Sequence, residues 1–140
     1  MHKQLGLVDL IAAIQKKVQD NTGRKCYDAV PKNAPSPFYF AEVVGKRSAH
    51  SKTMYRDVFT VWIHVVATPP TEGGATSVQI YSLIEDLEEA LTEDIVLPEG
   101  FDLIVQTNNG VQTIKTDETN EKHAVLDFEF TVCYGFKCKN

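Results

Sequence analysis

The sequence has no long hydrophobic run, no excess of basic residues and few cysteines, and each absence excludes a class of protein. No apolar stretch approaches the roughly 20 residues that a membrane-spanning helix needs, so we expect no membrane segment. The first residues, 1–5, have one lysine but neither a continuous apolar region nor a small-residue cleavage site, which argues against secretion. The net charge of −5, from 14 basic and 19 acidic residues, argues against general nucleic-acid binding.

The three cysteines, Cys26, Cys133 and Cys138, are an odd number without the spacing of metal ligands. We interpret them as reduced, structural residues of a protein that folds in the cytoplasm. A disulfide between Cys133 and Cys138, near the end of the chain, is the alternative.

Catalytic motifs are also absent. The sequence has no nucleophile elbow, no phosphate-binding loop and no dinucleotide fingerprint. Cys26 with His64 or His50 would supply a nucleophile and a base, but nothing in the sequence places them together. We therefore predict no catalytic, metal-binding or cofactor-binding residue, and no enzyme activity. None of the histidines forms a His-x-x-x-His pair: His2, His50, His64 and His123.

The strongest strand signal runs from Tyr55 to Ala67 and stops at Pro69-Pro70. Alternate residues point to opposite faces of a strand, so the segment divides into two rows. One row is mixed and includes Trp62 and His64. The other row is mostly apolar and is predicted to face the core: Tyr55, Asp57, Phe59, Val61, Ile63, Val65 and Ala67.

Two amphipathic helices are predicted, at Leu7 to Val18 and at about Ser77 to Leu91. Gly23 suits the left-handed residue that follows the first helix, and Thr76 or Ser77 suits the N-cap of the second. The apolar stripe of the first helix consists of Leu7, Leu10, Ile11, Ile14 and Val18. The stripe of the second consists of Ile80, Leu83, Ile84, Leu87 and Leu91.

Further strands are predicted on both sides of the second helix. One runs from Phe38 to Val44. Phe101 to Gln106 and Val111 to Thr116 are predicted to form a hairpin around Asn108-Asn109-Gly110, because Asn-Gly is a strong hairpin signal. The last strand, His123 to Tyr134, alternates, with these residues inside: Leu126, Phe128, Phe130, Val132 and Tyr134.

The remaining segments complete the predicted architecture. Prolines exclude Pro31 to Pro37 from a helix interior or a central strand, and Gly45 to Tyr55 is predicted to be a long hairpin loop. The order of elements predicts an α+β, two-layer fold with a mainly antiparallel sheet of about four to six strands and two helices packed on one face. We expect a single domain over residues 1–140, with a core at about 5–134 and a short, loose tail at 135–140.

The candidate functional residues are surface groups. Trp62 belongs either to a second small core or to an interface, where aromatic residues are enriched. A basic group lies in and beside the predicted loop: Lys46, Arg47, His50, Lys52 and Arg56. An acidic group lies on the outer face of the second helix: Glu85, Asp86, Glu88 and Glu89. We predict that the two charged groups contact successive subunits or different partners; the alternative is that both are ordinary solvated faces.

The order and spacing of several short motifs resemble the small tail-completion, or tail-terminator, proteins of long-tailed bacteriophages and prophages. An N-terminal amphipathic helix leads to Cys26-Tyr-Asp-Ala-Val-Pro31, and Pro37-Phe-Tyr-Phe40 then enters a strand. A strongly apolar strand with Val61-Trp-Ile63 is followed by the helix from Val78 to Leu91. The similarity covers about residues 5–134.

The resemblance implies a non-enzymatic structural protein that closes the head-proximal end of the tail tube, ends its polymerisation and joins it to the head connector. It implies a homo-hexameric ring in the virion tail, assembled in the host cytoplasm, with the tail-tube protein and the connector as partners. An acidic ring would let DNA pass without binding it. The alternatives are another head-tail connector or minor capsid component, a small intracellular enzyme or ligand-binding module, and an adaptor that binds a partner strand at a sheet edge.

Overall fold

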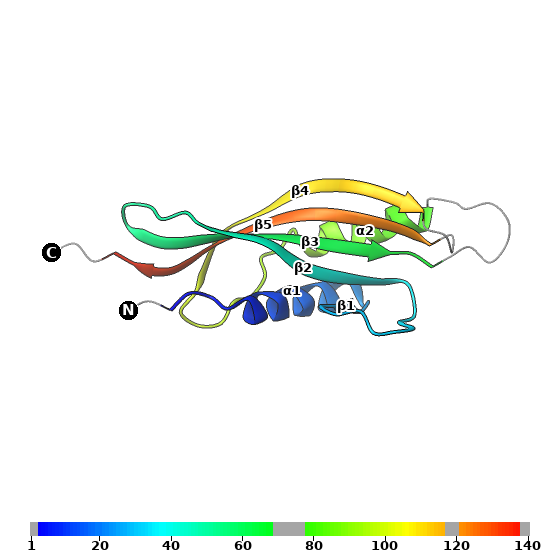
Figure 1. Cartoon of the computed structure of the whole chain (residues 1–140), viewed down its shortest axis with the longest axis horizontal. Helices are drawn as coiled ribbons and strands as arrows, with labels where there is room; N and C mark the ends of the chain where they lie inside the picture. The colour runs from blue at the N-terminus through cyan, green and yellow to red at the C-terminus, as the bar shows by residue number, and fades with distance from the viewer. Residues whose placement is uncertain (1–2, 69–77, 117–120, 138–140) are drawn as a thin grey trace.

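The computed structural model describes residues 3–68, 78–116 and 121–137. It is an α+β, two-layer fold: five strands form one open sheet in the order β1-β2-β3-β5-β4, and both helices lie on the same face of it (Figure 1). No helix in these ranges is long and apolar enough to cross a membrane. The elements are α1 (Leu7–Thr22), β1 (Cys26–Tyr27), β2 (Phe38–Ser48), β3 (Met54–Val66), α2 (Val78–Ala90), β4 (Asp102–Thr116) and β5 (Lys122–Phe136).

β3, which contains most of the segment with the strongest strand signal, lies at the centre of the sheet. It pairs antiparallel with β2 on one side and with β5 on the other. The predicted core row is confirmed from Asp57 to Ala67, all of whose members are buried, whereas Tyr55 is only half-buried. The opposite row is more exposed and contains Trp62.

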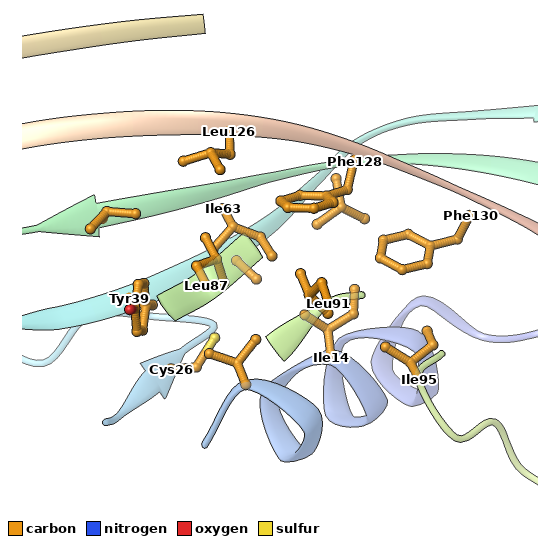
Figure 2. Close-up of a cluster of buried hydrophobic side chains, with 14 of the residues drawn as sticks. Ile14, Cys26, Tyr39, Ile63, Leu87, Leu91, Ile95, Leu126, Phe128 and Phe130 are labelled. Atoms are coloured by element: carbon orange, nitrogen blue, oxygen red, sulfur yellow. The ribbon is translucent and has the colours of Figure 1, made fainter. Parts of the chain in front are cut away.

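The core lies between the sheet and the two helices. Figure 2 shows Ile14 of α1 and Leu87 of α2 facing side chains of the sheet such as Ile63 and Phe128. α1 extends to Thr22, one turn beyond the predicted end, and Gly23 then takes the expected left-handed conformation with φ of 72°. The stripe of α2 is confirmed, because each of its five members is buried: Ile80, Leu83, Ile84, Leu87 and Leu91.

The prediction of a long loop from Gly45 to Tyr55 is wrong. β2 continues to Ser48 and β3 starts at Met54, which leaves only residues 49–53 as the turn. Gly45 does not end the strand; it follows a bulge, where the pairing with β3 shifts between Val43 and Gly45. A bulge inserts an extra residue without ending the ladder, so the glycine marked an irregularity inside a strand.

The predicted hairpin around Asn108-Asn109-Gly110 is also wrong. β4 is one strand of 15 residues, paired with β5 over its whole length. Gly110 has φ of 94°, and the pairing shifts between Asn108 and Gly110. The Asn108 side-chain oxygen accepts a hydrogen bond from the Gly110 N–H at 2.8 Å. The positive φ that a tight hairpin needs therefore serves a β-bulge here.

Two further segments, the short strand β1 and the C-terminal end of β5, also differ from the prediction. Cys26 and Tyr27 form a short strand that pairs parallel with β2, so the sheet is mixed. β5 continues to Phe136, and the Lys137 N–H donates a hydrogen bond to the Thr53 carbonyl at 2.8 Å. Residues 135–137 are therefore not the loose tail that was expected; positions 138–140, like the N-cap candidates Thr76 and Ser77, lie outside the described residues.

Candidate assembly interface

The face of the sheet opposite the helices carries Trp62. Glu42, Trp62 and Asp127 lie side by side on β2, β3 and β5, because the three strands are in register there. The Trp62 side chain is 38% exposed, and its Nε1–H donates a hydrogen bond to Asp127 Oδ2 at 3.3 Å. A ring this exposed among carboxylates does not belong to a second core, which leaves the interface role as the proposal for it.

Carboxylates gather around Trp62 on this open face. Asn109 of β4 donates hydrogen bonds from Nδ2 to Asp127 at 3.3 Å and to Glu129 at 3.1 Å. Arg47 of β2 lies 3.7 Å from Glu129, in an exposed ion pair of small energetic value. Glu42 and the two carboxylates of β5 make the part of this face around Trp62 acidic. The amide of Asn109 fixes their positions across the bulge at Gly110.

His64 belongs to the same face and does not meet Cys26. Its ring stacks on Phe40 with a centroid separation of 4.0 Å, and its Nε2 lies 2.7 Å from Glu42 Oε1. Cys26 is buried on the helix side of the sheet, beside Tyr39 (Figure 2). Burial, reinforced by the charge of Asp28, raises the pKa of the Cys26 thiol to about 12, which disfavours the nucleophilic thiolate.

The second base considered for Cys26 is also remote. Cys26 is opposite Tyr39, near the start of β2, whereas His50 lies in the turn that follows the end of this strand. Ser48 is nine residues beyond Tyr39 along the strand, a span of about 30 Å. Neither pairing of Cys26 with a histidine is therefore formed. Cys133 is a buried free cysteine, and its predicted alternative partner Cys138 lies outside the described residues.

The basic group predicted in and beside one loop is divided between the two faces of the sheet, because β2 continues through Lys46 and Arg47 and neighbouring strand residues point to opposite faces. Lys46 is opposite Phe59 and therefore points to the helix side of the sheet. Its Nζ lies 2.9 Å from Gln4 Oε1 and 3.9 Å from the buried carboxylate of Asp57. Arg47 is opposite Val58 and points to the open face. The two neighbours in sequence thus lie on opposite sides of the sheet.

The other basic residues are near the turn between β2 and β3. The Arg56 Nε–H donates to the Ala49 carbonyl at 2.8 Å, and the Arg56 N–H donates to His50 Nδ1 at 3.0 Å. The His50 ring packs edge-on against Tyr55 and Tyr134. These contacts give Arg56 and His50 a role in shaping the turn, and Lys52 is exposed at its tip.

The acidic group on α2 divides as well. Glu88 accepts a hydrogen bond from Asn108 Nδ2 of β4 at 2.6 Å, while Glu85 remains exposed. Asp86 and Glu89 line a cleft of about 590 Å³ between the C-terminal ends of α1 and α2. Lys17 lies 2.6 Å from Glu93 in the same cleft and lowers the pKa of this carboxyl. In the described ranges, no three metal-ligating side chains group closely enough to hold a metal ion.

Two further surfaces, the open edges of the sheet, were not predicted from the sequence. Among the described residues, β1 covers the outer edge of β2 only at Tyr39 and Phe40, and β4 pairs on one side only, with β5. Beside the uncovered part of β2 lies a groove of about 380 Å³, lined partly by Leu7, Val8 and Ile11 of α1. The signal for this groove was Val8, an apolar residue outside the core stripe of its helix, which is 83% exposed.

Comparison with known proteins agrees with this structure. A chain in a solved structure titled "Virion of native gene transfer agent (GTA) particle" has a similar fold, with a TM-score of 0.65 and 20% sequence identity. The alignment covers 90% of this chain and 96% of that chain. No curated protein matches the sequence. The model of the phage tail terminator 4 family, described as "Putative tail termination protein", matches residues 1–140. The chain therefore belongs to this family and is a structural protein of the phage tail.

Proposed function

We propose that this chain caps the head-proximal end of the phage tail tube, stops tube polymerisation and joins the tail to the head connector. The observation that carries the proposal, beside family membership, is a sheet in which most of β2 and the whole of β4 have no second strand partner among the described residues. An edge strand with free N–H and C=O groups is a template for pairing with another chain. A structural protein that binds neighbours on several sides can pair with them through such edges, whereas a monomeric protein usually covers its sheet edges.

The active form is proposed to be a homo-hexameric ring, assembled in the host cytoplasm and without enzyme activity. Different edges on the two sides of one subunit favour head-to-tail contacts, which close into a ring when the rotation between subunits allows it. The similarity in fold to a chain of a gene transfer agent virion supports a place inside a particle. The net charge of −5 and the carboxylates of the open face suit a ring that DNA crosses without binding.

Tube growth tests the proposal directly. The tail-tube protein of the same phage is polymerised with increasing amounts of this chain, and tube lengths are measured by electron microscopy. We expect the mean length to fall as the ratio rises, with extra density at one end of each tube only. Tube lengths that stay unchanged up to equimolar amounts, with no density at either end, would refute the capping function.

A further inference from the structure

The two open edges of the sheet run in opposite directions. β2 is antiparallel to β3, β3 to β5, and β5 to β4, so β4 and β2 themselves point opposite ways. If β4 of one copy lies beside the outer edge of β2 of the next, the two strands are antiparallel and the sheet continues from copy to copy. The helices of both copies then lie on the same face of the joined sheet.

The outer edge of β2 offers unpaired backbone and an apolar groove. From Ala41 to Ser48, no described strand pairs with this edge. The groove between this edge and α1 is lined by Ala41 and Val43 of the strand and by apolar side chains of the helix. An extended segment laid along β2 would bond to its backbone and place alternate side chains in the groove, as in strand addition.

β4 has the side chains to fill such a groove. Val111 and Ile114 are opposite Leu126 and Ala124 of β5, so both point to the helix side of the sheet. Their neighbours on β5 are buried, yet Val111 and Ile114 are 40% and 43% exposed. An edge strand of 15 residues with apolar side chains exposed on it is the kind that proteins cover or blunt.

The helix layer also has an apolar residue on this side. Glu88 of α2 contacts Asn108 of β4, which fixes the side of the helix that faces this strand. Tyr81 is two helical turns before Glu88, about 10 Å along the axis of α2. Val111 is about 10 Å beyond Asn108 along β4, which runs opposite to α2. Tyr81 is 51% exposed, so it extends the apolar surface of β4 toward the α1 helix of the next copy.

Charges on the open face agree with the same alignment. β4 has Asp102 near its start and Lys115 near its end, and β2 has Glu42 near its start and Arg47 near its end. All four residues are in the row of their strand that points away from the helices. Antiparallel pairing with Val111 and Ile114 in the groove brings Lys115 of one copy toward Glu42 of the next, which favours this direction; Asp102, 13 residues before Lys115, lies too far along β4 to meet Arg47 in the same register.

We propose that β4 of one copy adds antiparallel to the outer edge of β2 of the next, with Val111 and Ile114 in the groove beside α1. The proposal rests on the ring of the proposed function and identifies the two surfaces that join its subunits. The contact is heterologous: each copy offers β4 to one neighbour and its groove to the other.

Two variants block one surface each. Ala12→Arg fills the groove, and Val111→Lys puts a charge on β4; both positions are exposed, so the folded monomer tolerates them. The matched control, Val96→Lys, places a lysine on a valine that is 76% exposed, against 40% for Val111, and that belongs to neither edge strand nor the groove lining. Self-association is measured by light scattering and native mass spectrometry, and circular dichroism checks that each variant is folded. When the wild type alone is monomeric, the same comparison is made on the ends of tail tubes.

Each blocked variant should lose self-association by about tenfold or more, while the control assembles like the wild type. Mixing the two blocked variants should restore one interface and give a dimer that grows no further, because each partner has one blocked surface. Hydrogen exchange provides a second measure: assembly of the wild type should protect amides in residues 41–48 and in the part of β4 around Val111 and Ile114.

Three results would overturn the proposal. One is a blocked variant that assembles like the wild type, the second is a mixture that stays monomeric, and the third is assembly without new amide protection on β2 and β4. In each case, tube capping by the wild type is tested separately, by the tube-growth assay. A wild type that neither self-associates nor binds tubes would refute the ring and this interface together.

Discussion

The buried carboxylate of Asp57 allows a quantitative test of the fold. Asp57 is 1% exposed, and neither of its oxygens has a hydrogen-bond partner among the described residues. The nearest opposite charge is Lys46 Nζ at 3.9 Å. At an effective dielectric constant of about 20, two unit charges at this distance attract each other by about 4 kcal/mol.

Removing the lysine leaves the carboxylate buried without a countercharge. Breaking a buried pair in this way typically costs about 3–5 kcal/mol, and we expect about 2–3 kcal/mol for Lys46→Met because the side chain of Lys46 is still 35% exposed. Urea unfolding followed by circular dichroism measures the loss. The matched control is Arg47→Met, at the next position on the open face, where we expect less than about 1 kcal/mol.

A double-mutant cycle identifies the cause. Asp57→Asn removes the charge that Lys46 balances, so the cost of Lys46→Met should fall by about 2 kcal/mol when it is made in the Asp57→Asn background. If the two substitutions are additive within about 0.5 kcal/mol, the attraction between the charges is not what Lys46 contributes. Its contacts with Gln4 and with the Phe59 ring, 5.6 Å from Nζ, would then account for the loss.

Two further predictions concern buried groups. Folding raises the pKa of Cys26 from 9.0 to about 12, so the unfolded chain loses this proton at a lower pH than the folded chain. The free energy of unfolding should therefore fall by about 1.4 kcal/mol per pH unit between pH 9 and 12. Urea midpoints measured across this range should fall less in Cys26→Ala. Gln106→Ala should lower the free energy of unfolding by about 2 kcal/mol, because the side chain donates to the carbonyls of Leu91 and Glu93 and accepts from the Ile95 N–H. The exposed Gln79→Ala is the control for this loss, and equal losses at both positions would contradict the role of Gln106.

The parts of the fold that were predicted correctly are those in which one physical signal dominates. The stripe of α2 and the core row of β3 follow from apolar periodicity, which burial alone decides. Gly23 ends its helix because few other residues adopt its left-handed conformation at low cost. These features are local, so a single sequence contains all the information that they need.

The errors occur where one local signal fits two structures. Asn109-Gly110 supplies the positive φ of a hairpin turn, but also that of a bulge, and only the pairing with β5 decides between them. Gly45 likewise suits the end of a strand or a bulge inside one. The unpaired edges were missed for a related reason: a strand's neighbours are set by the order of the strands in the sheet, which the pattern within that strand does not contain.

The bulge in β2 changes what the basic residues can do. Without the extra residue between Val43 and Gly45, Lys46 and Arg47 would each point to the opposite face, because a shift of one residue reverses a strand's faces. Lys46 would then leave Asp57 without a countercharge in the core. The bulge thus gives Lys46 a role in stability and leaves Arg47 on the open face, available to a partner. A charge reversal of both residues would confuse folding with assembly, whereas Arg47→Glu alone changes only the surface.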